Sequence, residues 1–326
     1  MKVLSSIIGI ALLCGGGSAM SAEADKDYPV RSVKILVQYP PGGAPDLVAR
    51  VMAAKLGESL GQSFVVENRA GASGNIATDA VAKAPPDGYT LLLASDPPIT
   101  INPSLYAKLP FDPVKDLAPV TLMTASAFLI LTGPDNPANS LQEFVARAKK
   151  NPGKFNFASS GAGSVHHLAG ESLNTVAGLR LTHVPYRGFG PGSLDVMSGK
   201  VELMFGSVSA GVGLVKGGKM KALAVTGAKR FPGLPQVPTV EEAGFPGLET
   251  YAWFGLMAPA GTSQQIIDKL NSEILKAMRQ TDVMERFSAQ GLDIVGAGPA
   301  EFASRINVDS KKWAEVIKAS GAKAEN

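Results

Sequence analysis

Residues 33–60 combine a short strand, a glycine turn and a helix, and this combination constrains the fold more than any other stretch. The β-branched residues Val33, Ile35 and Val37 stand at every second position of a short, mainly apolar run flanked by Gln38, which predicts a buried strand. A Pro-Pro-Gly-Gly turn follows, and apolar residues then recur at helical spacing. The N–H groups of Gly42, Gly43 and Ala44 would lie at the positive end of the helix dipole. The segment therefore predicts an anion-binding turn.

A carboxylate in the first turn of this helix, Asp46, offers an alternative, because it could accept hydrogen bonds from the same N–H groups. The repetition of the design favours ligand binding. Three further strand–turn–helix units have strands at 63–68, 155–158 and 181–184 and turns at 69–75, 159–164 and 185–192. Four such units predict a parallel α/β sheet with donor-rich loops at its strand ends, and a cleft between two lobes.

The first 24 residues predict a secretory signal peptide. Lys2 supplies the positive start, residues 3–13 the apolar run, and Ala22-Glu23-Ala24 a cleavage pattern. The apolar run is too short to span a bilayer. The only cysteine, Cys14, falls inside this segment, so the mature chain would have no disulfide and no thiolate nucleophile. We expect an exported protein of the periplasm.

The length of 326 residues favours two domains, and no linker separates two halves. We therefore expect the lobes to exchange chain, with residues 25–126 and 252–326 in one lobe and residues 127–251 in the other. The net charge is only +3 and no block of basic residues is present, which argues against a nucleic-acid partner. We expect a monomer.

Three motifs suggest chemistry that their context does not support. Residues 57–61 match a serine-hydrolase elbow, but a helix ends there instead of beginning. Residues 213–219 match the start of a phosphate-binding loop, but Met220 stands where a hydroxyl is needed. His166 and His167 are adjacent on a helix and point about 100° apart, so they cannot serve one serine or one metal. The sequence predicts no metal site and no cofactor.

The chain resembles the extracytoplasmic solute-binding receptors of tripartite tricarboxylate transporters, the Bug family. Motifs typical of these receptors occur in order across the mature chain, at 39–46 (YPPGGAPD), 66–75 (VENRAGASGN), 86–90 (PDGYT), 101–103 (INP), 111–116 (FDPVKD), 160–170 (SGAGSVHHLAG), 183–186 (HVPY), 222–226 (ALAVT), 237–244 (VPTVEEAG) and 258–261 (APAG). The resemblance implies a two-lobed type II periplasmic binding-protein fold, with a small organic acid held in the cleft between the lobes.

The chain departs from the family pattern at three positions that we expect to face the cleft. Tyr39 replaces the usual Phe and adds a hydroxyl. Residues 96–99 (DPPI) replace a sequence with two more hydrogen-bonding side chains, and Gly206 replaces a frequent Asp. The identity of the acid therefore cannot be transferred from a relative.

We expect the ligand contacts to come from the glycine turns and the strand ends beside them. The candidates are Tyr39, Gly42, Gly43, Ala44, Ala72, Ser73, Ser95, Asp96, Ser160, Gly163, Ser164, His167, Tyr186 and Ser207. The leading hypothesis is a receptor that delivers a carboxylate to the membrane components of a tripartite transporter. The alternatives are a sensor module for a membrane histidine kinase and, with less support, a periplasmic serine hydrolase.

Overall fold

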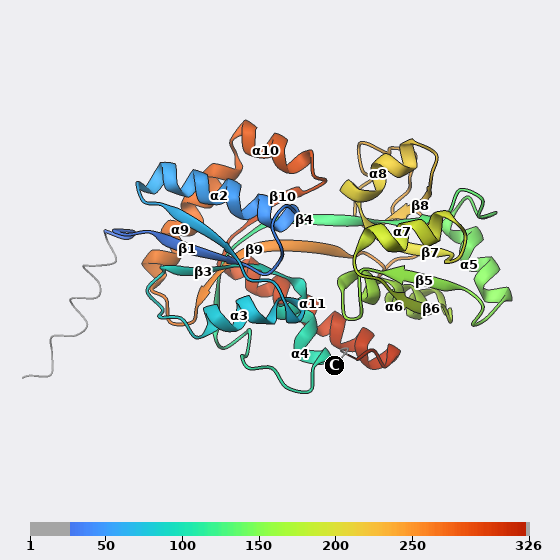
Figure 1. Ribbon diagram of the computed structural model, residues 1–326, viewed down its shortest axis with the longest axis horizontal. Coiled ribbons are helices and arrows are strands. Elements are labelled where there is room, and N and C mark those ends of the chain that lie inside the picture. Colours follow the sequence, from blue (N-terminus) through green and yellow to red (C-terminus); the bar gives the residue numbers. More distant parts are fainter. Residues whose placement is uncertain (1–26, 324–326) are drawn as a thin grey trace, which may run out of the picture.

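The computed structural model describes residues 27–323, which form two lobes joined by two long strands (Figure 1). The predicted signal peptide lies outside the described residues. The first lobe begins with β1 (Val33–Val37), α2 (Ala44–Leu60), β2 (Phe64–Asn68), η1 (Ala72–Gly74), α3 (Asn75–Ala82), β3 (Thr90–Ser95), η2 (Pro97–Ile101) and α4 (Asn102–Leu105). The chain then crosses to the second lobe along β4 (Leu117–Thr132).

The second lobe contains eight elements between the two crossings. They are α5 (Leu141–Lys150), β5 (Asn156–Ser159), α6 (Val165–Ala177), β6 (Thr182–Pro185), α7 (Phe189–Met197), β7 (Leu203–Ser207), α8 (Val208–Lys216) and β8 (Lys221–Val225). The chain returns along β9 (Tyr251–Pro259) and adds α9 (Gln264–Met278), α10 (Thr281–Ser288), β10 (Asp293–Ala297) and α11 (Pro299–Ser320).

All four predicted strand–turn–helix units are confirmed, as β1–α2, β2–α3, β5–α6 and β6–α7. The strands of these units pair in parallel, with β1 between β2 and β3, and β5 between β6 and β7. The sheet also contains antiparallel strands that the sequence did not predict, because β9 runs antiparallel to β3 and β4, and β4 antiparallel to β7. These antiparallel strands connect the lobes into one ten-stranded sheet.

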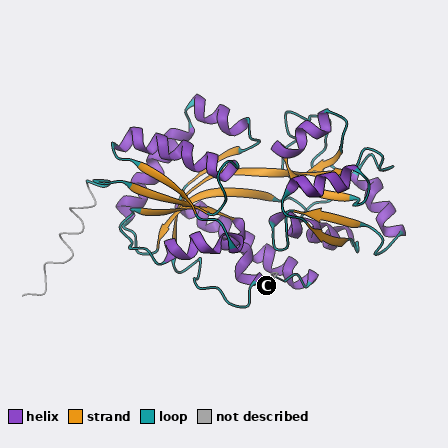
Figure 2. Cartoon of the chain, viewed as in Figure 1, coloured by secondary structure: helices purple, strands orange, loops and turns teal. Residues whose placement is uncertain are grey.

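Strand β4 changes partners where the chain passes from one lobe to the other. Residues 117–127 pair with β9, and Phe128 to Thr132 pair with β7 and β8. Helices cover both faces of the strands in each lobe, as Figure 2 shows. In the first lobe α2 and α9 share one apolar core with the sheet, and α3 and α11 share another. Each lobe is thus a three-layer α/β/α unit.

The C-terminal helix α11 contacts both lobes, although the sequence placed it wholly in the first. Trp313 and Ile317 pack in one apolar cluster with Ile101 from the first lobe and Phe128 and Leu168 from the second. This cluster lies at the junction of the lobes (Figure 1). Among residues 27–323 we find no helix with the length and apolar character that a bilayer crossing requires.

Candidate functional site

Two adjoining cavities lie between the lobes, at the carboxyl ends of the parallel strands. The smaller one has a volume of about 370 Å³ and the larger about 650 Å³. Tyr39, Pro97, Val165 and His166 line both cavities, so the two form one continuous cleft. Open α/β sheets bind ligands at this place, outside the carboxyl ends of their strands.

The turn between β1 and α2 forms one wall of the smaller cavity. Helix α2 begins without a side-chain cap, since its N-cap residue is Gly43. No acceptor among the described residues binds the N–H groups of Gly43 and Ala44. The prediction that the N–H of Gly42 is also free is wrong, because it donates to Asp46 Oδ2 at 3.0 Å. Two unused N–H donors therefore lie at the positive end of the helix dipole.

Asp46 is a fixed anion beneath this turn. Its Oδ2 accepts from Arg50 Nε at 2.9 Å and its Oδ1 accepts from Asn68 Nδ2 at 2.9 Å. These hydrogen bonds, Arg50 first, outweigh burial and lower the pKa of Asp46 to about 2. The carboxylate consequently positions Gly42 and holds the turn, while the next two N–H groups stay available.

The two glycines of the turn differ in what they require. Gly42 has φ +95°, a conformation that L residues with a side chain rarely adopt. Gly43 has φ −88° and ψ 176°, extended backbone open to any residue. A Cβ at Gly43 would meet only Pro45 Cδ, at 3.6 Å. Neither backbone nor packing needs glycine at Gly43, so its bare surface serves close approach from the cleft.

Tyr39 and Asp96 stand on the same side of the smaller cavity as this turn. The Tyr39 hydroxyl lies 3.0 Å from Ser95 Oγ. Burial and the nearby Asp96 raise the pKa of Tyr39 to about 12, against the opposing effect of the Ser95 hydrogen bond. Asp96 is 1% exposed; Oδ2 accepts from the Trp253 N–H at 2.8 Å, and Oδ1 has no partner among the described residues. Burial, followed by the charge of Asp309, raises the pKa of Asp96 well above its ordinary value.

The turn between β5 and α6 lines the larger cavity, and side chains of the turn and of α6 satisfy several of its N–H donors. Ser164 caps α6 by accepting from the His167 N–H at 3.2 Å, and its hydroxyl donates to the Gly161 carbonyl at 2.7 Å. The Gly161 N–H donates to Ser159 Oγ, and the Gly163 N–H donates to His167 Nδ1. The hydroxyl of Ser164 is thus committed to the fold.

The adjacent histidines take opposite roles from those that we expected. His166 lines both cavities, packs against Phe128 with ring centroids 4.6 Å apart and ring planes tilted by 60°, and places Nδ1 2.8 Å from Ser160 Oγ. Burial lowers the pKa of His166 to about 4, so the ring is neutral near pH 7. His167 is 6% exposed and stacks on His183 at 3.7 Å, away from both cavities. His167, which we expected to contact the ligand, lines neither cavity.

Tyr186 is the other candidate that lies outside both cavities. Its hydroxyl donates to Asp195 Oδ2 at 2.8 Å and its ring packs on the core of the second lobe. The remaining candidates do line the cleft. The smaller cavity contains Tyr39, Gly42, Gly43, Ala44, Ser95, Asp96 and Ser207, and the larger contains Tyr39, Ala72, Ser73, Ser160, Gly163 and Ser164.

Sequence reasoning missed the apolar part of the cleft. The walls of the smaller cavity include Phe128, Val165, Ala252, Phe254 and Leu292. Alternation in the sequence marks such residues as core, and nothing local indicates that their rings and methyl groups border a cavity. At Gly206, the glycine that replaces a frequent Asp, a Cβ would lie 2.3 Å from the Phe189 ring. An aromatic ring thus occupies the space an aspartate would need.

The residues that line these two cavities include no lysine and no arginine. Within residues 27–323 no group of three or more His, Cys, Asp or Glu side chains could hold a metal ion. An anion in this cleft would therefore be held by N–H groups and hydroxyls, without an ion pair to a side chain.

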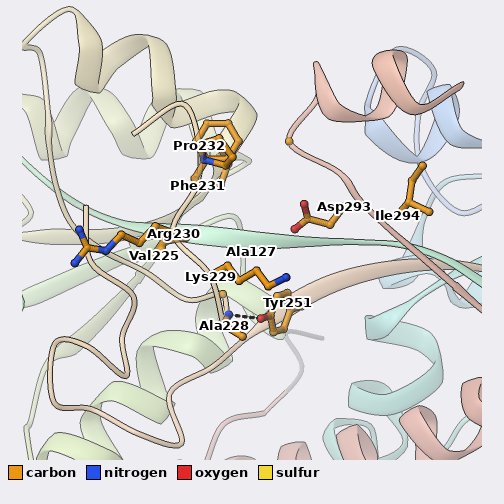
Figure 3. Close-up of a pocket in the computed structure, with 13 residues that line it drawn as sticks. Ala127, Val225, Ala228, Lys229, Arg230, Phe231, Pro232, Tyr251, Asp293 and Ile294 are labelled. Atoms are coloured by element: carbon orange, nitrogen blue, oxygen red, sulfur yellow. Dashed lines mark hydrogen bonds between the residues drawn. The ribbon is translucent and has the colours of Figure 1, made fainter. Parts of the chain in front are cut away.

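A third cavity of about 430 Å³ lies beside the strands that join the lobes (Figure 3). The loop with Lys229 and Phe231 forms one side and Asp293 of β10 lies on the other. Tyr251 accepts a hydrogen bond there from the Ala228 N–H. Partial burial raises the pKa of Asp293, and Lys229 opposes the shift. None of the candidate contacts lines this cavity, and no glycine turn of a strand–turn–helix unit reaches it.

Two α/β lobes with a donor-lined cleft between them define a type II periplasmic binding protein. The sequence is 38% identical to the protein BugT of Bordetella pertussis over 324 residues, which cover 99% of each chain. The structure is similar to Rpa4515 of R. palustris with adipate (34% identity, TM-score 0.79, 91% of this chain and 99% of the other). It is also similar to MatC of Rhodopseudomonas palustris with bound malate (34% identity, TM-score 0.76, 89% of this chain and 100% of the other).

Residues 48–322 match the family described as the tripartite tricarboxylate transporter family receptor. The chain belongs to this family of receptors, as the resemblance of its motifs predicted. It is a solute-binding receptor and not an enzyme. The hydrolase-like match at 57–61 agrees with this conclusion, because Ser59 lies in the last turn of α2 and donates to the Leu56 carbonyl.

Proposed function

We propose that the protein is a periplasmic receptor that binds one small organic carboxylate between its lobes and presents it to the membrane components of a tripartite transporter. The uncapped start of α2 carries this proposal. The N–H groups of Gly43 and Ala44 have no protein acceptor among the described residues, and Gly43 is bare where neither backbone nor packing demands it. A carboxylate is the ligand that such a helix start prefers.

Two relatives support the chemical class of the ligand. The solved structures of Rpa4515 and MatC hold adipate and malate, both dicarboxylates. The cleft of the present chain has no cationic side chain, so we infer that it takes a single carboxylate at the β1–α2 turn. Backbone N–H groups would bind the carboxylate in place of an arginine or lysine side chain.

We further propose that residues 25–126 and 252–326 form one lobe and residues 127–251 the other, since β4 changes partners between Ala127 and Phe128. Both walls of the cleft come from one chain, and the protein would act as a monomer. Residues 1–24 would direct it to the periplasm and be removed.

Thermal unfolding with paired acids and amides tests the proposal. We expect at least one small monocarboxylate to stabilise the protein, while its primary amide does not. A ligand at 100 times its dissociation constant adds about 2.7 kcal/mol to the free energy of unfolding. Equal stabilisation by an acid and its amide would contradict carboxylate recognition. Chemical change of the acid during incubation would contradict a receptor.

A further inference from the structure

We propose that Tyr39 acts as a hydrogen-bond acceptor in the cleft and selects monocarboxylates with an apolar body that also carry a hydroxyl or ammonium group. The inference rests on the proposed function, because it assumes that the carboxylate occupies the β1–α2 turn. It concerns a residue in which this chain departs from the usual Phe of its family.

The inference depends on which atom donates in each bond of a buried hydrogen-bond chain behind Tyr39. This chain begins at a backbone carbonyl, which can only accept. The Thr78 hydroxyl donates to the Gly74 carbonyl at 2.9 Å. Thr78 Oγ1 therefore accepts from its next neighbour, Gln38 Nε2, at 2.8 Å. This contact fixes the side-chain amide of Gln38, with its nitrogen toward Thr78 and its oxygen toward Ser95.

The same logic runs from Gln38 to the cleft. Gln38 Oε1 accepts from Ser95 Oγ at 2.7 Å, which uses the only hydrogen of that hydroxyl. The Tyr39 hydroxyl, 3.0 Å from Ser95 Oγ, must then be the donor of that hydrogen bond. Gln38, Thr78 and Ser95 are each at most 2% exposed, so water does not interrupt the chain. The phenolic oxygen of Tyr39 can offer only lone pairs to a ligand.

The direction of this hydrogen-bond chain excludes a carboxylate as the partner of Tyr39, because a carboxylate has no hydrogen to donate. Asp96 interacts electrostatically with Tyr39, and its Oδ1 is another buried oxygen without a partner among the described residues. No cation lines the cavity, whereas Phe128, Phe254 and Leu292 do. A second anion would find no cationic partner in this cavity, and the apolar walls accommodate an apolar body. A hydroxyl or ammonium group supplies the hydrogen that the Tyr39 oxygen lacks.

Matched probes test the direction of the hydrogen bond. Isothermal titration would compare benzoate with the three monohydroxybenzoates, and hexanoate with 6-hydroxyhexanoate and 6-aminohexanoate. For the wild-type protein, we expect at least one hydroxyl or amino probe to bind about tenfold more tightly than its parent acid. Tyr39→Phe should abolish this preference, so that a probe and its parent acid bind the variant with equal affinity.

Two further variants separate the direction of the bond from the mere presence of a hydroxyl. Ser95→Ala frees the hydrogen of Tyr39, so the preference for 6-aminohexanoate, whose ammonium can only donate, should fall. Tyr89→Phe makes the same chemical change outside the cleft, where Tyr89 accepts from the Val30 N–H, and should preserve the preference.

The outcomes distinguish this inference from the proposed function. If parent acids bind but hydroxyl and amino probes bind no better, or if Tyr39→Phe keeps the preference, the role of Tyr39 is wrong and the carboxylate receptor stands. If no acid of either series binds, the proposed function fails and the inference fails with it.

Discussion

Each lobe contributes a glycine turn and helix start to the cleft, and these two differ in whether a side chain caps the helix. The β1–α2 turn of the first lobe has no side-chain cap and leaves the N–H groups of Gly43 and Ala44 free of protein acceptors among the described residues. In the β5–α6 turn of the second lobe, Ser159, His167 and Ser164 accept from the N–H groups of Gly161, Gly163 and His167, while those of Val165 and His166 have no acceptor among the described residues.

This difference shows that glycine content alone does not make an anion site. What matters is whether the turn carries side chains that can occupy its donors. In the first lobe Asp46 occupies only the Gly42 donor. In the second lobe serine and histidine side chains occupy three donors, and the side chains of His166 and the apolar Val165 line the smaller cavity. The first lobe would bind the carboxylate, and the second would enclose the rest of the ligand.

The largest change in ligand affinity is expected from a substitution that occupies the free N–H groups of the first turn. Gly43→Glu places a competing carboxylate at the two free donors. Loss of a charge-assisted hydrogen bond costs about 1.5–3 kcal/mol, so the affinity for the carboxylate should fall at least tenfold by isothermal titration.

Gly43→Ala is the matched control for this variant. The backbone at Gly43 accepts any residue, and a Cβ there makes only ordinary contact. The alanine variant should have the same or a slightly higher melting temperature, because its free energy of unfolding should rise by up to about 1 kcal/mol. Loss of stability in Gly43→Ala would show that the glycine serves the turn itself.

Acid should affect the second lobe before the first. Burial lowers the pKa of His166 and of His183 to about 4, from an ordinary value of 6.5. Because the folded pKa is lower, the stability is complete above pH 6.5 and declines as the pH falls toward 4. Both rings are half-buried, so solvent screens part of the effect, and each histidine should change the free energy of unfolding by roughly 1–2 kcal/mol.

Asp46 contributes in a lower window. Its stabilising effect is complete above pH 3.8 and is lost as the pH falls toward about 2. Urea unfolding at pH 7, 5, 4 and 3 measures both declines. Asp46→Asn should leave the decline between pH 6.5 and 4 unchanged, while His166→Phe should reduce it. A decline that begins only below pH 4 would contradict the burial of the histidines.

The smallest effect is expected at the cap of the second turn. Ser164 accepts from the His167 N–H and donates to the Gly161 carbonyl, so its hydroxyl has no hydrogen left for a ligand. Ser164→Ala should lower the free energy of unfolding by about 1 kcal/mol and change the affinity little. A tenfold loss of affinity with unchanged stability would make the second turn a donor site after all.

The sequence predicted the elements that depend on local chemistry. Gly61 ends α2 in the left-handed conformation, and the free N–H groups of Gly43 and Ala44 follow from the turn itself. The first part of β4 was missed, because Thr121, Thr124 and Ser126 are buried there and break the apolar alternation. The choice between His166 and His167 depends on the rotation of α6 against the sheet, which local sequence does not fix.

The most direct test of the central claim is the response of backbone amides to the ligand. Proton–nitrogen correlation spectra would be titrated with the acid that gives the strongest thermal stabilisation. We expect the N–H protons of Gly43 and Ala44 to move most strongly downfield, while those of Gly42, Gly161 and Gly163 keep their protein acceptors and move little. Large shifts at Gly161 and Gly163 with none at Gly43 and Ala44 would contradict the claim that the first lobe binds the carboxylate.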